Sequence, residues 1–150
     1  MLTQLQIGYL AGLLDGEGQI SIIKAARNDR RTPRLRRYEL RVEVRITQRR
    51  RLLLDTVLSW IGREHGTVAS TGLDKRYFVL RFKAPWLRAH LGTISRHLIL
   101  KRRQAEVVQI FLNHRPHVGR LGVGEDEWAK RDALHAEVKA LNADRSNGSS

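Results

Sequence analysis

The sequence contains no cysteine among its 150 residues. It therefore has no disulfide bonds and no thiolate metal sites, a composition that fits a reducing compartment. No apolar run approaches the roughly 18 residues that a membrane-spanning helix requires, and the N-terminus lacks the basic and then apolar segments of a signal peptide. These absences predict a soluble, intracellular protein of the cytoplasm, the nucleoid or an organelle interior, which is not secreted and has no membrane partner.

Histidine clusters and common catalytic motifs are also missing. The six histidines are scattered, and His114 and His117 stand on either side of Pro116, which disfavours a shared helical face. The sequence shows neither a Ser-His-Asp arrangement nor a glycine-rich phosphate loop. These observations argue against a histidine-bound metal, a serine hydrolase and a P-loop nucleotide-binding protein.

Acidic residues are the minority charge. The chain has 28 Lys+Arg against 15 Asp+Glu, a formal net charge of +13. Such a field attracts polyanions, and the predominance of arginine over lysine suits bidentate contacts to phosphate and guanine. Charge alone indicates a nucleic-acid partner and does not separate a DNA-binding protein from a basic structural RNA-binding protein.

The hydrophobic pattern predicts one globular domain over residues 1–143 and a flexible polar tail over 144–150. Strands are expected at 19–26, 38–48, 66–70 and 76–83, and helices at 7–15, 52–61, from 85 onwards, 101–114 and 125–141. Residues 27–37 are expected to form a basic loop, and 91–100 a broken helix. This order predicts an α+β fold in which a four-stranded antiparallel sheet carries helices on one face and leaves the other free.

Residues 38–48 show the most regular alternation in the chain. Val42, Val44 and Ile46 point to one side, while arginine and glutamate side chains point to the other. The pattern is typical of a half-buried antiparallel strand. Its charged side is either a solvated surface or a face that reads DNA, because arginine bonds guanine and glutamate accepts a hydrogen bond from cytosine.

Residues 7–15 form a helical pattern with a stripe of small side chains. The stripe consists of Gly8, Ala11, Gly12 and Asp15. Ile7, Leu10 and Leu14 lie opposite and suit an apolar core. Glycine inside a helix costs roughly 1 kcal/mol relative to alanine, so the stripe predicts close approach of a second helix.

Two carboxylates follow at the end of this helix, where the helix dipole is already negative. Gly16 and Gly18 are expected to adopt the positive φ that ends a helix. If a second copy packs on the stripe about a two-fold axis, Glu17 meets another Glu17. Only a divalent cation would stabilise such a cluster, whereas Asp15 is expected to cap or orient.

Residues 10–18, with the sequence LAGLLDGEG, resemble the signature of the LAGLIDADG homing endonucleases, DNA-cleaving enzymes encoded by mobile introns and inteins. The chain departs from the signature at Glu17, where the family has aspartate. The expected element order is similar to the family's αββαββα half-domain, with a saddle-like sheet and trailing C-terminal helices. Because the motif occurs once, the resemblance implies a homodimer whose interface is Gly8, Ala11, Gly12 and Asp15.

The resemblance also implies a metal-dependent nuclease site. Glu17 and the backbone carbonyl of Gly16 are expected to bind Mg²⁺, with Mn²⁺ or Ca²⁺ able to take its place. Gln48 is expected to position water, and Lys101 to stabilise charge on the reacting phosphate, a role shared with Arg51 or Arg50. Without the resemblance, Gln48 is a polar strand end and Lys101 a solvated helix N-terminus.

The resemblance assigns contacts to double-stranded DNA to outward residues of the strands and to the basic loop. These are Ser21, Ile23, Lys24, Arg34, Arg36, Arg37, Arg41, Glu43, Arg45, Tyr77, Val79 and Arg81. The alternative to a nuclease is an inactive relative on the same fold, acting as an RNA maturase or a DNA-binding regulator. A basic structural RNA-binding protein is the other alternative, but it has no use for a helix of small residues ending in two acids.

Overall fold

The computed structural model describes residues 1–26, 38–72, 75–114 and 124–147. The elements are α1 (Gln4–Glu17), β1 (Gly18–Ala26), β2 (Tyr38–Gln48), α2 (Arg51–Ile61), β3 (Gly66–Thr71), β4 (Tyr77–Phe82), α3 (Ala84–Ser95), α4 (Arg102–Asn113) and α5 (Glu125–Asn147). A 3₁₀ turn, η1 (Arg63–His65), joins α2 to β3. The predicted order of helices and strands is confirmed. No described helix is both long and apolar enough to cross a membrane.

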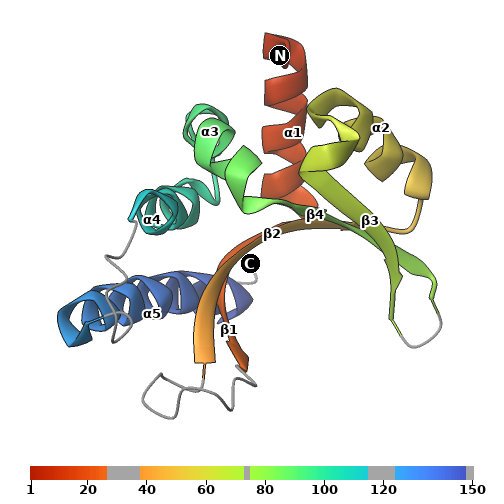
Figure 1. Ribbon diagram of the computed structural model, residues 1–150. Coiled ribbons are helices and arrows are strands. Elements are labelled where there is room, and N and C mark those ends of the chain that lie inside the picture. Colours follow the sequence, from red (N-terminus) through yellow and green to blue (C-terminus); the bar gives the residue numbers. More distant parts are fainter. Residues whose placement is uncertain (27–37, 73–74, 115–123, 148–150) are drawn as a thin grey trace.

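The four strands form one antiparallel sheet in the order β1-β2-β4-β3. Figure 1 shows the sheet curved into an arch, with α1, α2, α3 and α4 on its convex side and α5 beside β1. The concave side is left open below the arch (Figure 1). The α+β prediction, with helices gathered on one face and the other free, is therefore confirmed.

The core lies between the convex face of the sheet and the helices. Strand residues on this face include Ile20, Val44, Ile46, Leu80 and Phe82, and helix residues include Ile7, Leu10, Leu14, Leu54, Val57, Leu87, Leu91, Ile94, Val107 and Val108. Each fully buried aliphatic side chain contributes roughly 1.5–3 kcal/mol relative to an exposed one. The alternation predicted for β2 therefore sets which side of the sheet the helices cover.

Helix α1 begins and ends in different ways. At its start, Thr3 and Gln6 form a reciprocal capping box, in which each side chain bonds the other residue's backbone N–H. At its end, the prediction of positive φ is wrong, because Gly18 has φ −85°. A Cβ on Gly18 would lie 2.6 Å from the Cα of Leu14. Gly18 is therefore required by a close approach between the strand and the helix.

The last helix is longer than the sequence suggested. It continues to Asn147, so residues 144–147 belong to a helix and not to the predicted tail. Asn142 donates a side-chain hydrogen bond to the backbone carbonyl of Ile20 at 3.1 Å. Strand β1 is an edge of the sheet, and this contact satisfies one of its unpaired backbone groups. Helix α3 is also longer than predicted and takes in Leu91 and Ile94.

Candidate functional site

Glu17 and Gln48 meet where α1 ends. Glu17 is the last residue of α1, and its exposed carboxylate accepts a hydrogen bond from the side-chain amide of Gln48 at the end of β2. Strand pairing produces this contact, because Gly18 lies opposite Ile46 and Gln48 follows on the same side of the strand. The two residues predicted to bind metal and position water are thus brought together.

Asp15 is turned away from Glu17 and towards α4. Its carboxylate accepts hydrogen bonds from the backbone N–H groups of Ile99, Leu100 and Lys101 at 2.7, 3.1 and 3.0 Å. Such N–H groups near the start of a helix lack intrahelical partners and favour a negative charge. Asp15 therefore acts as a cap that links the end of α1 to the start of α4, and its place in a dimer interface stays a prediction.

The side chain of Lys101 contacts the end of α1 in return. It is buried, with 8% of its surface exposed, and its ammonium group donates to the backbone carbonyls of Leu14, Asp15 and Gly18. These carbonyls form the negative end of α1, where a cation is stabilising. Lys101 thus holds the end of α1, and its predicted role in stabilising charge on the reacting phosphate stays a prediction.

The arginines after Gln48 lie at the start of α2. Arg51 bonds Asp55 at 3.2 Å, and its guanidinium stands 5.8 Å from the centre of the Phe78 ring. Arg50 precedes the helix and is exposed. Within the described chain, no hydrogen bond or ion pair joins either arginine to Glu17.

The oxygen donors at the end of α1 suit a hard cation. Glu17 offers an exposed carboxylate, and the backbone carbonyl of Gly16 is close in sequence. Magnesium is commonly held by one or two carboxylates, with waters and substrate phosphates completing its shell. Among the described residues, no group of three or more His, Asp or Glu side chains gathers in one place. Glu17 and the carbonyl of Gly16 are therefore the oxygen donors that this helix end could offer a cation.

The predicted small-residue stripe divides into a buried part and an exposed part. Ala11 is 1% exposed and belongs to the core, so its assignment to the dimer interface is corrected. Gly8 and Gly12 are exposed, and a Cβ on either would meet nothing within 4 Å. The helical angle separates them from Ala11, because residues at i and i+4 share a face more closely than residues at i and i+3.

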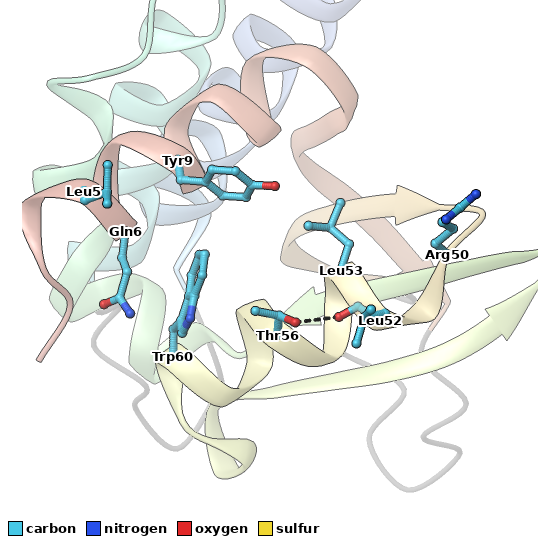
Figure 2. Close-up of a pocket in the computed structure, with 8 residues that line it drawn as sticks. All are labelled: Leu5, Gln6, Tyr9, Arg50, Leu52, Leu53, Thr56 and Trp60. Atoms are coloured by element: carbon cyan, nitrogen blue, oxygen red, sulfur yellow. Dashed lines mark hydrogen bonds between the residues drawn. The ribbon is translucent and has the colours of Figure 1, made fainter.

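An apolar groove adjoins these glycines, and the sequence analysis missed it. It has a volume of about 560 Å³ and is lined by Leu5, Gln6, Tyr9, Arg50, Leu52, Leu53, Thr56 and Trp60. Figure 2 shows Tyr9 of α1 facing Leu53 and Trp60 of α2 across it. Leu5 and Leu52 are 84% and 78% exposed. The sequence does contain an indication of this groove, because Leu5 and Tyr9 fall on the same face of α1 as Gly8 and Gly12.

Polar side chains cross the concave face in a row. The register aligns Gln19 of β1 with Arg45 of β2, Arg81 of β4 and Thr67 of β3. Arg45 donates to the side chain of Gln19 at 2.8 Å, and Glu43 lies 3.4 Å from Arg45 and 3.7 Å from Arg81. These contacts hold the arginines on the open side of the sheet, where a polyanion can reach them.

Two of the predicted DNA contacts are covered in this structure. Ser21 is 6% exposed and bonds the carbonyl of Glu43, and Val79 is 1% exposed. By contrast, Lys24, Arg41 and Tyr77 are exposed, and Ile23, Glu43, Arg45 and Arg81 are partly exposed. Arg34, Arg36 and Arg37 lie outside the described residues. Gln19 and Thr67 share the concave row and were missed, although strand alternation places Gln19 beside Ser21.

No protein-family model and no curated protein sequence matches the chain. Solved structures do. The homing endonuclease I-CvuI, in complex with a DNA target, matches with a TM-score of 0.77 and 23% identity over 92% of this chain and 82% of its own. The archaeal intron-encoded homing endonuclease I-Vdi141I, complexed with DNA, matches with a TM-score of 0.73 and 18% identity over 91% of this chain and 84% of its own. The LAGLIDADG homing endonuclease I-LtrWI, bound to target DNA, matches with a TM-score of 0.68 and 15% identity over 91% of this chain and 45% of its own.

Proposed function

We propose that this chain, whose fold is that of the LAGLIDADG homing endonucleases, is a site-specific DNA endonuclease that works as a metal-dependent homodimer. One observation carries the proposal. Helix α1 exposes Gly8 and Gly12 on a face where no described residue would come within 4 Å of an added Cβ, and the same helix ends at Glu17 beside Gln48. A partner on that face would bring a second carboxylate to the first.

The described part of one copy does not require glycine at position 8 or 12. Alanine would fit at either position without contact and would favour the helix by roughly 1 kcal/mol. The adjoining groove leaves Leu5, Tyr9 and Leu52 exposed, an apolar surface that association would cover. A two-fold axis beside the glycine face of α1 satisfies both features, because each copy then offers the same face to the other.

Metal binding follows from the same geometry. Two Glu17 carboxylates that approach each other repel unless a cation lies between or beside them. Glu17, with the carbonyl of Gly16, would hold Mg²⁺, and Mn²⁺ or Ca²⁺ would occupy the same oxygen ligands. When bound, the metal neutralises charge on the scissile phosphate and lowers the pKa of a bound water.

The remaining residues of the site position these groups. The amide of Gln48 fixes the orientation of Glu17 and is placed to contact a water at the same carboxylate. Lys101 and Asp15 hold the end of α1 against α4, which keeps Glu17 in place, and Arg50 and Arg51 supply positive charge beside the site. DNA would lie on the concave face against the row of Arg45 and Arg81, and each copy would cut one strand across the minor groove.

The second candidate is a DNA-binding regulator or an RNA maturase that no longer cleaves DNA. The observation that favours it is the engagement of Lys101 with three backbone carbonyls, since no lysine of the described residues makes a hydrogen bond or ion pair with the Glu17 carboxylate. Such a protein would keep the basic concave face and the dimer without hydrolysis.

Cleavage of a plasmid library that carries candidate intron and intein insertion sites separates the two candidates. The nuclease predicts linear plasmid with Mg²⁺, none with EDTA, and none with the Glu17→Gln variant, which should still bind DNA. Binding by the unaltered protein without cleavage in any metal would support the regulator or maturase. Cleavage by Glu17→Gln would refute the metal assignment.

A further inference from the structure

A second pocket lies at the free edge of the sheet, between β1 and α5. It has a volume of about 410 Å³ and is lined by Gln19, Ser21, Ile22, Ile23, Lys24, His135, Val138, Lys139 and Asn142. Gln19 also belongs to the polar row on the concave face. The pocket is therefore continuous with the surface proposed to receive DNA, although α5 itself lies outside the sheet (Figure 1).

The described side chains that line this β1–α5 pocket include three bases and no acid. Lys24 comes from β1, and His135 and Lys139 come from α5. The neighbouring acid of α5, Glu137, is directed away and bonds Arg103 of α4. Two elements thus bring positive charge to one small concavity, the arrangement that phosphate binding requires.

The surroundings of His135 disfavour its protonated form. Burial lowers the pKa of His135 below its ordinary value of 6.5, and the charges of Lys24 and Lys139 lower it further. Asp132, one turn earlier on α5, acts in the opposite direction but does not reverse the shift. The imidazole therefore sits in a positive potential that a bound anion would relieve.

We propose that the β1–α5 pocket binds a backbone phosphate of the DNA duplex that lies on the concave face, so that α5 extends the DNA contact beyond the sheet. Lys139 and Lys24 supply the charge, and His135 adds a donor when it is protonated. This inference rests on the proposed function for the placement of DNA, but it requires neither a particular target sequence nor cleavage.

Phosphate binding and protonation of His135 are linked. An adjacent phosphate raises the pKa of the imidazole, so the complex takes up a proton between the pKa of free protein and the higher pKa of bound protein. DNA affinity should therefore rise as the pH falls through that window and level off below it. The His135→Asn variant, which cannot ionise, should lose this component of the pH dependence.

The test uses the full chain and a duplex of arbitrary sequence. The histidine resonances are titrated by NMR with and without the duplex, and the salt dependence of binding is measured for Lys139→Gln and for Lys130→Gln. Lys130 is the matched control, because it lies on the same helix but beside Glu127. Each lost phosphate contact lowers the slope of log affinity against log salt by about 0.9, so Lys139→Gln should lower it by about 0.9 for each copy bound and Lys130→Gln should not.

The outcomes separate this inference from the proposed function. A raised pKa of His135 on adding duplex, with a reduced slope for Lys139→Gln alone, supports the pocket even if no DNA is ever cleaved. An unchanged pKa of His135 in protein that binds duplex, or equal slopes for the two variants, overturns it and leaves the nuclease intact. The same shift with inorganic phosphate but not with duplex would assign the pocket to a free anion, and absence of any DNA binding would refute both proposals.

Discussion

Asp15, at the end of α1, and Lys101, just before α4, each bond unpaired backbone groups at the end of the other's helix. The Asp15 carboxylate accepts from the N–H of Lys101 at 3.0 Å, while the Lys101 ammonium donates to the carbonyl of Asp15 at 3.1 Å. Each charge thus lies at the helix end of opposite sign. This exchange explains how a carboxylate is tolerated at the C-terminus of α1, and it fixes the helix end that carries Glu17.

Replacing Lys101 tests this relationship. Lys101→Met keeps much of the side-chain volume but leaves buried carbonyls without a donor, so we expect the free energy of unfolding to fall by about 3 kcal/mol. Urea denaturation measures the change. Arg96→Met is the control, since Arg96 is exposed at the end of α3 and its side chain makes no hydrogen bond or ion pair with the described residues. A loss below about 0.5 kcal/mol, the usual range for surface changes, would show that Lys101 is solvated and available to substrate.

Gly18 tests the packing of the strand against the helix. A Cβ there would lie 2.6 Å from the Cα of Leu14, and backbone atoms cannot give way cheaply. We therefore expect Gly18→Ala to reduce the stability by about 1–3 kcal/mol. Gly92 lies at an exposed position of α3, where an added Cβ would have its nearest contact at 4.0 Å, the side-chain oxygen of Gln109. Gly92→Ala should therefore be neutral or slightly stabilising. Equal stability of the two variants in thermal unfolding would contradict the close approach.

Gly12 tests the interface. We expect Gly12→Ala to preserve or raise the stability of the isolated chain by up to roughly 1 kcal/mol, yet to weaken association, because the added methyl group separates the two helices. Sedimentation at micromolar concentration should show twice 17.3 kDa for the unaltered protein and for Gly92→Ala, and a larger monomer fraction for Gly12→Ala. A species of 17.3 kDa alone in the unaltered protein, with DNA present, would exclude the dimer.

The stability should fall on the acid side of neutrality. Burial lowers the pKa of both His90 and His135 below 6.5, with nearby positive charge adding to the effect. The unfolded chain therefore binds more protons than the folded chain between these pKa values and 6.5, so the free energy of unfolding rises with pH in that window. Denaturation series from about pH 5 to about pH 8 should show this rise, and a combined His90→Asn and His135→Asn variant should flatten it.

The fold was largely accessible from the sequence because its signals are local. The alternation of Val42, Val44 and Ile46 identified a half-covered strand, and the helix expected at 52–61 matches α2, which ends at Ile61. The length of α5 was underestimated, since the contact that anchors its end, between Asn142 and Ile20, joins residues far apart in the chain. Sequence periodicity carries no information about such a contact.

The site was accessible only where it depended on chain order. The resemblance assigned Glu17 and Gln48 to one site, and their side chains do meet, because the pairing of Gly18 with Ile46 brings the end of β2 to the end of α1. The surroundings of Lys101 were not accessible, because the sequence does not distinguish a buried lysine from a solvated one, and only the packing shows that its ammonium group contacts backbone carbonyls. Ala11 and Gly12 looked equivalent as small residues, but one residue of helical rotation places them on different faces.

Mixed dimers offer the sharpest test that two copies of α1 join through their glycine faces and that each supplies one Glu17 to one DNA strand. One copy would carry the unaltered sequence and the other Glu17→Gln, with different affinity tags so that only the mixed species is recovered. Supercoiled plasmid containing a cleavable site should be nicked by the mixed dimer, linearised by the unaltered dimer, and left intact by the doubly substituted one. Linear product from the mixed dimer, at the rate of the unaltered protein, would contradict the arrangement.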